Sequence, residues 1–379
     1  MDGPRAHPPH GRSCQSARAG IEDQLGPRPG AFAVMKVLVV NNMVPGLRGG
    51  AEELADQLVV HLRQAGHQSE LLRIPFSWQP PERIIDEMLM CRSMRLLNVD
   101  RVIAMKFPAY LLPFDEKVFW LAHQYRQAYD MWDAGHSNIP DTPEGRQIRA
   151  AITEADNDAF SLAQSIYAVG RTVQERLMHY NGIPSELLRA PLNDAELFTG
   201  GEYGDYIFAG GRINAGKRQH RLIEALAQTR SPVKLIIAGP ADTPADEQRL
   251  RALVESHGLQ SRVKLDIGFH PRQVIADYVN GALACAYLPM AEDSFGYVTM
   301  EACQSRKAVI TVDDSGDLTE LIKQGLNGWV CADDTSEIAA AMTEAFAARA
   351  QTRERGSNAY DSWTRLDINW ASTVEKLTR

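Results

Sequence analysis

The stretch KVLVVNNMVPGLRGGAEELADQLVVHL at 36–62 indicates the fold of this chain. Its opening, KVLVV, is a nearly continuous, valine-rich run, which is typical of a strand buried in a parallel sheet. A loop with one proline and several glycines follows, and Leu54, Leu58 and Leu62 then repeat at helical spacing. The pattern predicts a strand, a glycine-rich loop and an amphipathic helix that stops at Gly66.

Further apolar runs predict a series of strands with helices between them. In the first half these runs are SELLRI (69–74), RVIAM (101–105), VFWLA (118–122) and SIYAV (165–169), the last followed by a helix RTVQERLMHY. In the second half they are YIFAGG (206–211), KLIIAG (234–239), RVKLDIGF (262–269), ALACAY (282–287), AVITV (308–312) and GWVC (328–331). Strands that alternate with helices indicate an α/β fold with parallel, doubly wound sheets.

Chain length and a pause in the pattern predict two domains. With 379 residues the chain is too long for one ordinary core, and the proline- and glycine-containing segment 189–206 reads as a linker. We expect one domain at 35–199, a second at 200–360 and a C-terminal helix at 361–379 that crosses back onto the first. Ligands of open parallel sheets bind at the carboxyl ends of the strands, so the site should lie in the cleft between the domains.

Composition excludes several classes of protein. The formal net charge of −8 argues against a nucleic-acid binder. No apolar run approaches the roughly 18 residues that span a bilayer. The five cysteines show no paired spacing, which favours reduced thiols in a cytosolic protein over a zinc site. Residues 1–34 are rich in Pro, Gly and Arg without an apolar core, so we expect a disordered tail or an over-extended start rather than a secretory signal.

The run AEDSFGYVTMEA (291–302) carries the strongest site signal. Asp293 and Glu301 stand eight residues apart, where a loop feeds a helix. A helix start offers free N–H groups to an anion, and carboxylates accept hydrogen bonds from hydroxyl groups. This combination fits a nucleotide-sugar, with Asp293 at the sugar and Glu301 at the ribose; a surface loop with a helix-dipole acid is the alternative. The backbone amides expected to face the sugar or phosphate belong to Phe295, Gly296 and Tyr297.

GGRINAGKRQHRLIEAL (210–226) supplies the complementary cations. Arg212 and Lys217 lie five residues apart, after a strand and at the entry to a helix. Two cations at the end of a strand can neutralise a diphosphate that gains charge as a bond to it breaks. The alternative is a solvated basic turn, and the neighbouring Arg218 and Arg221 fit surface positions.

Residues of the first domain complete the predicted cleft. Gly49 and Gly50 open a helix, either as a phosphate-binding loop or as a tight turn; their spacing is not that of the dinucleotide fingerprint, which argues against hydride transfer. His123 follows a predicted strand, so it stands on the cleft rim or is a buried, hydrogen-bonded histidine. The candidates for the acceptor side are Lys106, Tyr125 and Arg126.

Four motifs together, GGAE, GRINAGKRQHRLIEAL, DSFGYVTME and DSGDLTELIKQGLNGWV, resemble the family 4 glycosyltransferases over residues 35–379. The resemblance implies a GT-B fold, in which two Rossmann-like domains face each other across a cleft. It implies retaining, metal-independent and cofactor-free transfer of a sugar, of hexosyltransferase type, from a UDP- or GDP-sugar to a hydroxyl of a glycan, lipid-linked or small-molecule acceptor. The catalytic residues would be His123, Arg212, Lys217 and Asp293. The donor-binding residues would be Gly49, Gly50, Gly211, Arg212, Lys217, Asp293, Ser294, Phe295, Gly296, Tyr297, Val298 and Glu301.

Two departures from the family pattern concern donor contacts. Asp293 is one methylene shorter than the usual glutamate, and Glu292 beside it can compensate for the lost reach. The usual Gly-Gly of the last loop reads Ser315-Gly316-Asp317, so this loop either closes the nucleotide side of the cleft, with acidic groups that tune donor choice, or is a structural turn.

Other functions on the same architecture stay open. One is a sugar-nucleotide epimerase or hydrolase, which needs no acceptor; another is a non-catalytic nucleotide-sugar-binding protein. We expect a cytoplasmic protein, either free or peripheral on the cytoplasmic face of a membrane, and polysaccharide biosynthesis as its setting. A basic patch that could meet such a membrane, or could equally be a solvated helix face, consists of Arg92, Arg95, Arg101 and Lys106.

Overall fold

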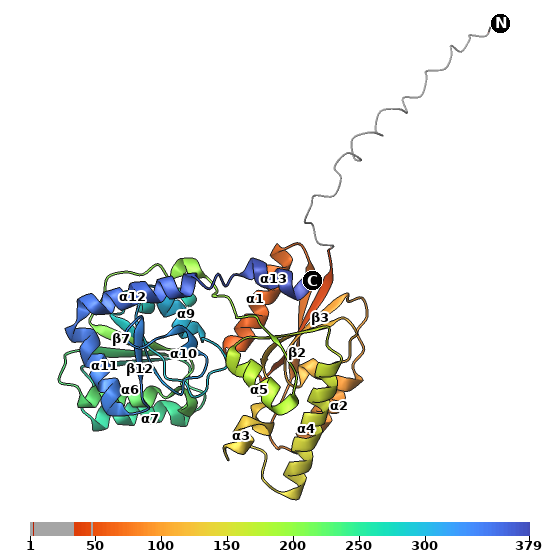
Figure 1. Ribbon diagram of the computed structural model, residues 1–379, viewed down its shortest axis with the longest axis horizontal. Coiled ribbons are helices and arrows are strands. Elements are labelled where there is room, and N and C mark those ends of the chain that lie inside the picture. The colour runs from red at the N-terminus through yellow and green to blue at the C-terminus, as the bar shows by residue number, and fades with distance from the viewer. Residues whose placement is uncertain (1–2, 4–33, 47) are drawn as a thin grey trace. The chain divides into compact units, whose positions relative to one another are not determined.

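The computed structural model describes residue 3, residues 34–46 and residues 48–379. The N-terminal extension predicted at 1–34 therefore lies outside the described residues, apart from Gly3 and Val34. Residues Met35–Arg379 form one unit that is built on two six-stranded sheets (Figure 1). Both sheets are parallel and carry helices, so the predicted α/β, doubly wound fold is confirmed.

The first sheet has the strand order β2-β1-β3-β4-β5-β6. Its strands are β1 (Lys36–Met43), β2 (Gln68–Pro75), β3 (Arg101–Lys106), β4 (Lys117–His123), β5 (Ser165–Ala168) and β6 (Glu186–Leu187). Its helices are α1 (Gly50–Gln64), α2 (Arg83–Ser93), α3 (Asp130–Asp133), α4 (Pro143–Ser161) and α5 (Arg171–Asn181), with short 3-10 turns η1 (Ala109–Leu111) and η2 (Arg126–Ala128). We call this sheet and its helices the first lobe.

The second sheet has the strand order β12-β11-β10-β7-β8-β9. Its strands are β7 (Tyr206–Gly210), β8 (Lys234–Gly239), β9 (Val263–Ile267), β10 (Ala284–Ala286), β11 (Val309–Val312) and β12 (Gly328–Cys331). Its helices are α6 (Gln219–Gln228), α7 (Pro244–Ser256), α8 (Arg272–Gly281), α9 (Tyr297–Gln304), α10 (Leu318–Leu321), α11 (Thr335–Ala347) and α12 (Arg349–Thr364), with the 3-10 turn η4 (Ala215–Lys217) before α6. We call this group the second lobe.

Each sheet has a core of its own because its strands are apolar on both faces. In the first lobe, β3 and β4 bury Ile103, Phe119 and Trp120 completely; in the second, β7 and β8 bury Ile207 and Ile237. Such strands belong to sheets that helices cover on both sides. The apolar runs end where the strands end, so the polar side chains that follow them gather at the carboxyl edges of the two sheets.

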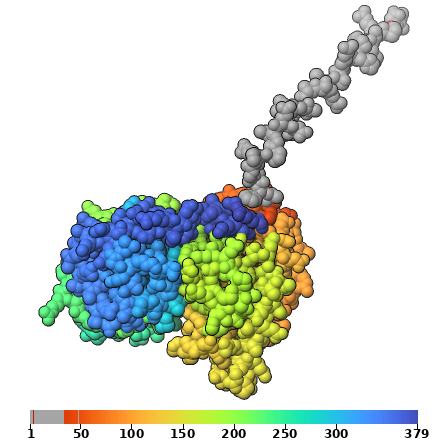
Figure 2. All heavy atoms as spheres, in the orientation of Figure 1, coloured from red at the N-terminus to blue at the C-terminus, as the bar shows by residue number. Residues whose placement is uncertain are grey.

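The chain passes between the lobes twice. The first crossing is segment 188–205, which contains the 3-10 turn η3 (Ala195–Leu197), and the second is segment 365–369, which leads into α13 (Trp370–Thr378). α13 lies beside α1, where Trp370 stacks on His61 with the ring centroids 4.4 Å apart (Figure 1). Figure 2 shows this dark blue C-terminal segment running from the second lobe to the first. The returning helix starts at Trp370 rather than at 361, because α12 still occupies residue 361.

A helix that spans a bilayer needs about 20 predominantly apolar residues. None of the helices in residues 34–46 and 48–379 is long and apolar enough to cross a membrane.

Candidate functional site

A cavity of about 430 Å³ lies between the carboxyl edges of the two sheets, with walls from both lobes. Most of the predicted site residues line it: Gly49, Gly50, Lys106, His123, Arg126, Gly211, Arg212, Lys217, Asp293, Ser294, Gly296, Tyr297 and Val298. Three predicted residues do not line it: Tyr125, Phe295 and Glu301. The structure thus brings together the residues that follow β1, β3 and β4 with those that follow β7 and β10.

Tyr125 and Phe295 are buried elsewhere. The ring of Tyr125 stacks on Phe107 with centroids 5.2 Å apart and meets Phe76 edge-on, so it belongs to the first core. The ring of Phe295 lies beneath the Arg189 guanidinium at 4.0 Å and is almost fully buried. Tyr125 therefore packs against aromatic partners inside the first lobe and does not line the cavity, and its predicted acceptor-side role stays a prediction.

The glycine pair lets the two lobes approach closely. A Cβ atom on Gly49 would lie 3.4 Å from Nε of Arg212, and one on Gly50 would lie 3.4 Å from the ring of Tyr297. The N–H of Gly49 donates to Oε2 of Glu52 at 2.9 Å, and Lys106 donates to the other oxygen of that carboxylate at 2.9 Å. Burial opposes the charge of Glu52, but Lys106 and the backbone N–H groups hold its pKa below the ordinary value.

Lys217 is fixed by the turn that precedes α6. Asn214 accepts the backbone N–H of Lys217 at 3.0 Å and so caps the 3-10 turn η4. The Lys217 ammonium donates to the hydroxyl of Tyr287 at 2.7 Å and pairs with the carboxylate of Glu292. Burial opposes the charge of Lys217, but Tyr287 and Glu292 hold its pKa above the ordinary value. Lys217 therefore presents a full positive charge to the cavity.

Arg212 is held more loosely on the same wall. Its Nη1 lies 3.3 Å from Oδ1 of Asp242, and about a third of its side chain is exposed. Asp242 also accepts Nδ2 of Asn214 at 2.8 Å, so one carboxylate fixes both the arginine and the capping residue of Lys217. The predicted cationic pair thus faces the cavity from one turn.

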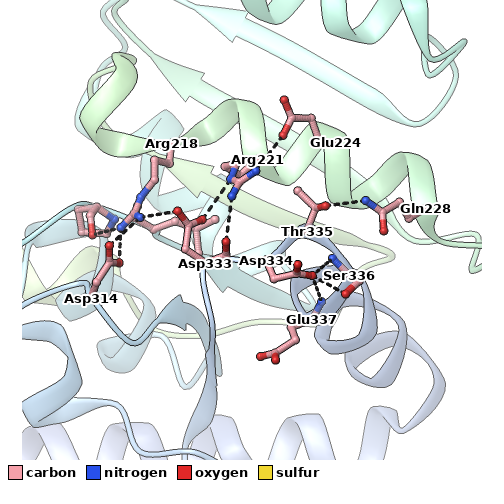
Figure 3. Close-up of polar contacts among 12 residues, drawn as sticks. Arg218, Arg221, Glu224, Gln228, Asp314, Asp333, Asp334, Thr335, Ser336 and Glu337 are labelled. Carbon is pink, nitrogen blue, oxygen red and sulfur yellow. Dashed lines mark hydrogen bonds and ion pairs between the residues drawn. The ribbon is translucent and has the colours of Figure 1, made fainter.

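Arg218, expected at the surface, is buried and links several loops instead (Figure 3). Its side chain is 4% exposed. It donates to the carbonyl oxygens of Leu288 and Pro289 at 2.8 and 2.9 Å. Its Nη1 also reaches the carboxylates of Asp314 and Asp333 at 2.9 and 3.0 Å. Arg218 therefore ties together the loops that follow β10, β11 and β12.

The loop after β11, which contains Ser315, Gly316 and Asp317, is bound within the structure as the structural-turn alternative expects. Asp314 is bound by Arg218, and the hydroxyl of Thr311 donates to that of Ser315 at 3.0 Å. Neither Asp314 nor Ser315 lines the cavity between the lobes. Asp317 is nearly fully buried and pairs with Arg189, so its carboxylate does not face a donor in this cavity.

Asp293 stands between two arginines of the first lobe. Its Oδ1 lies 2.7 Å from Nη1 of Arg176, and its Oδ2 lies 3.9 Å from Nη1 of Arg126. Both arginines also pair with Asp130, at 3.2 and 2.6 Å, which closes a ring of four alternating charges. Burial opposes ionisation of Asp293, but the charges of Arg176 and then Arg126 hold its pKa below the ordinary value. Asp293 is thus an ionised link between the lobes.

Sequence reasoning missed Arg176, although a signal was present. It lies on α5 three residues after Val173 and directly before Leu177, the two apolar residues that mark the inward face of this helix. A charged side chain on an inward face is expected to have a partner. In the structure that partner is Asp293, together with Asp130.

His123 lines the cavity as a neutral imidazole. Burial lowers its pKa and the charge of Lys106 lowers it further, although Asp293 opposes this. Its Nδ1 lies 2.7 Å from the carbonyl oxygen of Gln124, and because a carbonyl only accepts, the ring proton is assigned to Nδ1. Nε2 is then the acceptor atom of the ring.

A second cavity of about 380 Å³ adjoins the first and shares Gly49, Gly50 and Tyr297 with it. Phe269 and Arg272 also line this cavity, and Phe269 is 67% exposed. Arg272 pairs with Glu301. Glu301 thus reaches the wall of the second cavity through Arg272, and its predicted contact to a ribose stays a prediction.

Within residues 34–46 and 48–379, no group of three or more His, Cys, Asp or Glu side chains is placed to hold a metal ion. Metal independence of the transfer stays a prediction.

Comparisons with known proteins place this geometry in context. Residues 201–362 match the family model described as "Glycosyl transferases group 1". No curated protein matches the chain in sequence. Sucrose-phosphate synthase from Thermosynechococcus elongatus is similar in structure, with a TM-score of 0.71 and 16% identity over 90% of this chain and 97% of that chain. HepE of Anabaena in complex with UDP and glucose has a TM-score of 0.66 and 17% identity over 90% and 98%. Trehalose-6-phosphate from E. coli bound with UDP-2-fluoro glucose has a TM-score of 0.66 and 12% identity over 91% and 99%.

These findings establish the predicted GT-B architecture. The described chain has the GT-B fold, in which two α/β lobes flank a cleft, and the findings support a glycosyltransferase of GT-B type. The match to the group 1 glycosyltransferase model covers residues 201–362, which belong mainly to the second lobe. This match does not reach the level of family 4, so the assignment to family 4 stays a prediction.

Proposed function

We propose that this protein is a retaining glycosyltransferase of family 4 type. It moves a sugar from a UDP- or GDP-sugar to a hydroxyl of a glycan, lipid-linked or small-molecule acceptor, without a metal ion. The observation that carries the proposal is the cationic wall of the 430 Å³ cavity, which Arg212 and Lys217 line together and where Arg212 lies against Gly49 of the first lobe. Two cations and a helix start in one cleft are suited to a diphosphate.

The diphosphate would lie between Lys217, Arg212 and the start of α9. α9 begins at Tyr297, which lines the cavity together with Gly296. The free N–H groups of a helix start bind anions, and the macrodipole adds a positive potential there. As the glycosidic bond to the donor breaks, the charge that develops on the leaving diphosphate falls on these groups, whose stabilisation is worth several kcal/mol in such sites.

The nucleoside would occupy the second cavity. The exposed ring of Phe269 offers a stacking surface for a base, and the pair Arg272–Glu301 offers polar groups to a ribose. The two cavities share Gly49, Gly50 and Tyr297, so one ligand can extend through both. The similarity to HepE in complex with UDP and glucose favours a UDP-sugar as the first donor to test.

The transfer itself would take place beside His123. The bond between the anomeric carbon and the diphosphate oxygen breaks, and a bond from the acceptor oxygen forms on the same face. The acceptor proton passes to the leaving diphosphate oxygen. A neutral His123 can hydrogen-bond the donor sugar there without adding a charge, and Arg126 borders the acceptor side.

Loss of Lys217 tests the proposal most directly. Lys217→Ala should lower transfer from the active UDP- or GDP-sugar by on the order of 100-fold. Lys323→Ala is the matched control, since Lys323 is exposed and lines neither cavity. Near-full activity of Lys217→Ala would refute the diphosphate role. Release or isomerisation of sugar without an acceptor would support the epimerase or hydrolase alternative, and nucleotide binding without turnover would support a binding protein.

A further inference from the structure

Two neighbouring acids of the donor loop have different partners. Asp293 meets Arg176 of the first lobe, as described above. Glu292 instead pairs with Lys217, and its Oε2 accepts the hydroxyl of Tyr287 at 3.0 Å. Because Tyr287 in turn accepts from Lys217 at 2.7 Å, the three side chains form a closed triangle at the wall of the cavity. The positive charge of Lys217 is therefore already paired with the carboxylate of Glu292.

The backbone before Glu292 is shaped to direct it inward. Ala291 has a φ of +44°, a left-handed conformation that costs an alanine on the order of 1 kcal/mol. Two bonds hold it there: its N–H donates to the carbonyl of Asp314 at 2.9 Å, and its carbonyl accepts Nη1 of Arg126 at 3.3 Å. Hydrogen bonds from both lobes keep Ala291 in this strained conformation. We infer that the conformation fixes the direction in which the Glu292 side chain leaves the main chain.

The backbone of Glu292 itself is packed against the loop after β11. Its carbonyl accepts the N–H of Asp317 at 3.1 Å. Gly316, with a φ of +64°, lies so close that a Cβ atom there would be 2.6 Å from the nitrogen and 2.5 Å from the oxygen of Glu292. Only a glycine fits this approach. The main chain on both sides of the Glu292 side chain is thus fixed.

We propose that Glu292 is a positioning residue that competes with the donor diphosphate for Lys217. The inference rests on the proposed function and extends it. Before donor binds, Glu292 orients the ammonium; when a diphosphate arrives, two anions share one cation and repel each other. The carboxylate thereby weakens the binding of the diphosphate product and aids its release. Asp293 has no such role, because its charge is taken up by Arg176 and Arg126.

The charge-removing pair Glu292→Gln and Asp293→Asn separates the two acids. Glu292→Gln keeps the size of the side chain and its ability to accept from Tyr287 but removes the negative charge. We expect it to bind UDP, GDP and inorganic pyrophosphate about tenfold more tightly in calorimetry, and to be inhibited more strongly by the nucleoside diphosphate product. A gain in affinity cannot arise from a damaged fold. Asp293→Asn removes a charge that Arg176 and Arg126 already offset, so it should tighten pyrophosphate binding less than Glu292→Gln does. Glu320→Gln, at an exposed acid that lines neither cavity, should leave pyrophosphate binding unchanged.

A double-mutant cycle tests whether Glu292 acts through Lys217. In the Lys217→Ala background, Glu292→Gln should tighten pyrophosphate binding less than it does in the wild type, because the competition for the shared cation is gone and only the direct repulsion between the two anions remains. Unchanged or weaker binding by Glu292→Gln, with a wild type that binds UDP or GDP, would overturn the inference and leave the proposed function standing. Tighter binding by Asp293→Asn alone would also overturn it, in favour of Asp293. A wild type that binds neither nucleoside diphosphate nor pyrophosphate would overturn both.

Discussion

Asp317 accepts the backbone N–H of Arg171 through Oδ1 at 2.7 Å, although Asp317 belongs to the second lobe and Arg171 opens α5 of the first. The same oxygen lies 3.4 Å from the N–H of Thr172, and the other oxygen pairs with Arg189. Gly170 stands at the N-cap of α5 and has no side chain to satisfy these groups. The capping acid of this helix is therefore supplied by the opposite lobe.

Asp317→Ala should lower the free energy of unfolding by about 2 kcal/mol or more. The substitution removes a helix cap, typically worth about 1 kcal/mol, and leaves the largely buried Arg189 without its carboxylate. Asp334→Ala is a matched control, because Asp334 caps α11 within the second lobe. Urea denaturation of both variants measures the difference. An effect of Asp317→Ala no larger than that of Asp334→Ala would speak against coupling through Arg189.

Gly170→Ala should separate the lobes. A Cβ atom on Gly170 would lie 2.1 Å from the carbonyl oxygen of Asp293 and 3.0 Å from the carboxylate of Asp317, both in the second lobe. The backbone of Gly170 is extended, so alanine is acceptable there apart from this clash. We expect transfer activity to fall at least tenfold and the radius of gyration in X-ray scattering to rise, with an unchanged circular dichroism spectrum. Glu175→Ala, on the exposed side of α5, should alter none of these.

Arg218→Lys should be far more harmful than Arg221→Lys. Arg218 is buried and bonds to two carbonyls and two carboxylates, which a lysine cannot reach together. We expect a loss of about 3 kcal/mol. Arg221 is partly exposed and pairs with Asp333 and Glu224, so its replacement should cost less than about 1 kcal/mol. Thermal unfolding compares the two; equal losses would remove the hub role of Arg218.

Stability should depend on pH through Asp156. This residue is fully buried on α4 and accepts the hydroxyls of Tyr110 and Tyr129 at 2.8 and 2.7 Å. Burial raises the pKa of Asp156 to about 7, although the two tyrosine hydroxyls oppose the rise. In the unfolded chain the carboxyl ionises at about pH 4, so between these values the folded state binds the extra proton.

The consequence has a definite sign. Asp156 lowers the free energy of unfolding as pH rises from about 4 to about 7, by on the order of 1 kcal/mol per pH unit, and adds no slope above that range. Asp156→Asn has no titrating carboxyl group, so its free energy of unfolding should change less with pH over this range. Urea denaturation at several pH values in this range compares the two proteins. Parallel profiles would mean that the carboxyl is ionised in the folded protein throughout.

Phe269→Ala should separate nucleoside from phosphate recognition. Phe269 lines only the second of the two cavities, and its ring is largely exposed. Loss of a stacking surface should weaken the binding of UDP or GDP by about tenfold while leaving inorganic pyrophosphate unaffected. Calorimetry with both probes makes the comparison. Equal weakening of both would place the nucleoside elsewhere.

The architecture could be predicted because its signal is local. Runs such as KVLVV and KLIIAG are apolar throughout, and only a strand covered on both faces tolerates that. The second-lobe site was predictable for a similar reason, since Arg212 and Lys217 follow directly after β7 in one turn. A residue at the carboxyl end of a parallel strand has little freedom in where it lies.

The rest depended on contacts between distant segments. Arg176 and Asp293 are far apart in sequence, so no spacing rule relates them. Arg218 looked like a surface residue because its partners are the carbonyls and acids of three other loops. Tyr125 packs on Phe107 and Phe76, and the sequence alone does not separate such a core tyrosine from one that packs on a sugar.

The two chain crossings have a mechanical consequence. Asn193 of segment 188–205 donates to the hydroxyl of Tyr297 at 3.2 Å and accepts from the indole of Trp370, the residue that directly follows segment 365–369, at 3.2 Å. Because two segments connect the lobes, one lobe can rotate against the other about the line that joins the two segments but not about other axes. With rotation restricted to this axis, we expect closure of the cavity to bring Arg212 back beside Gly49.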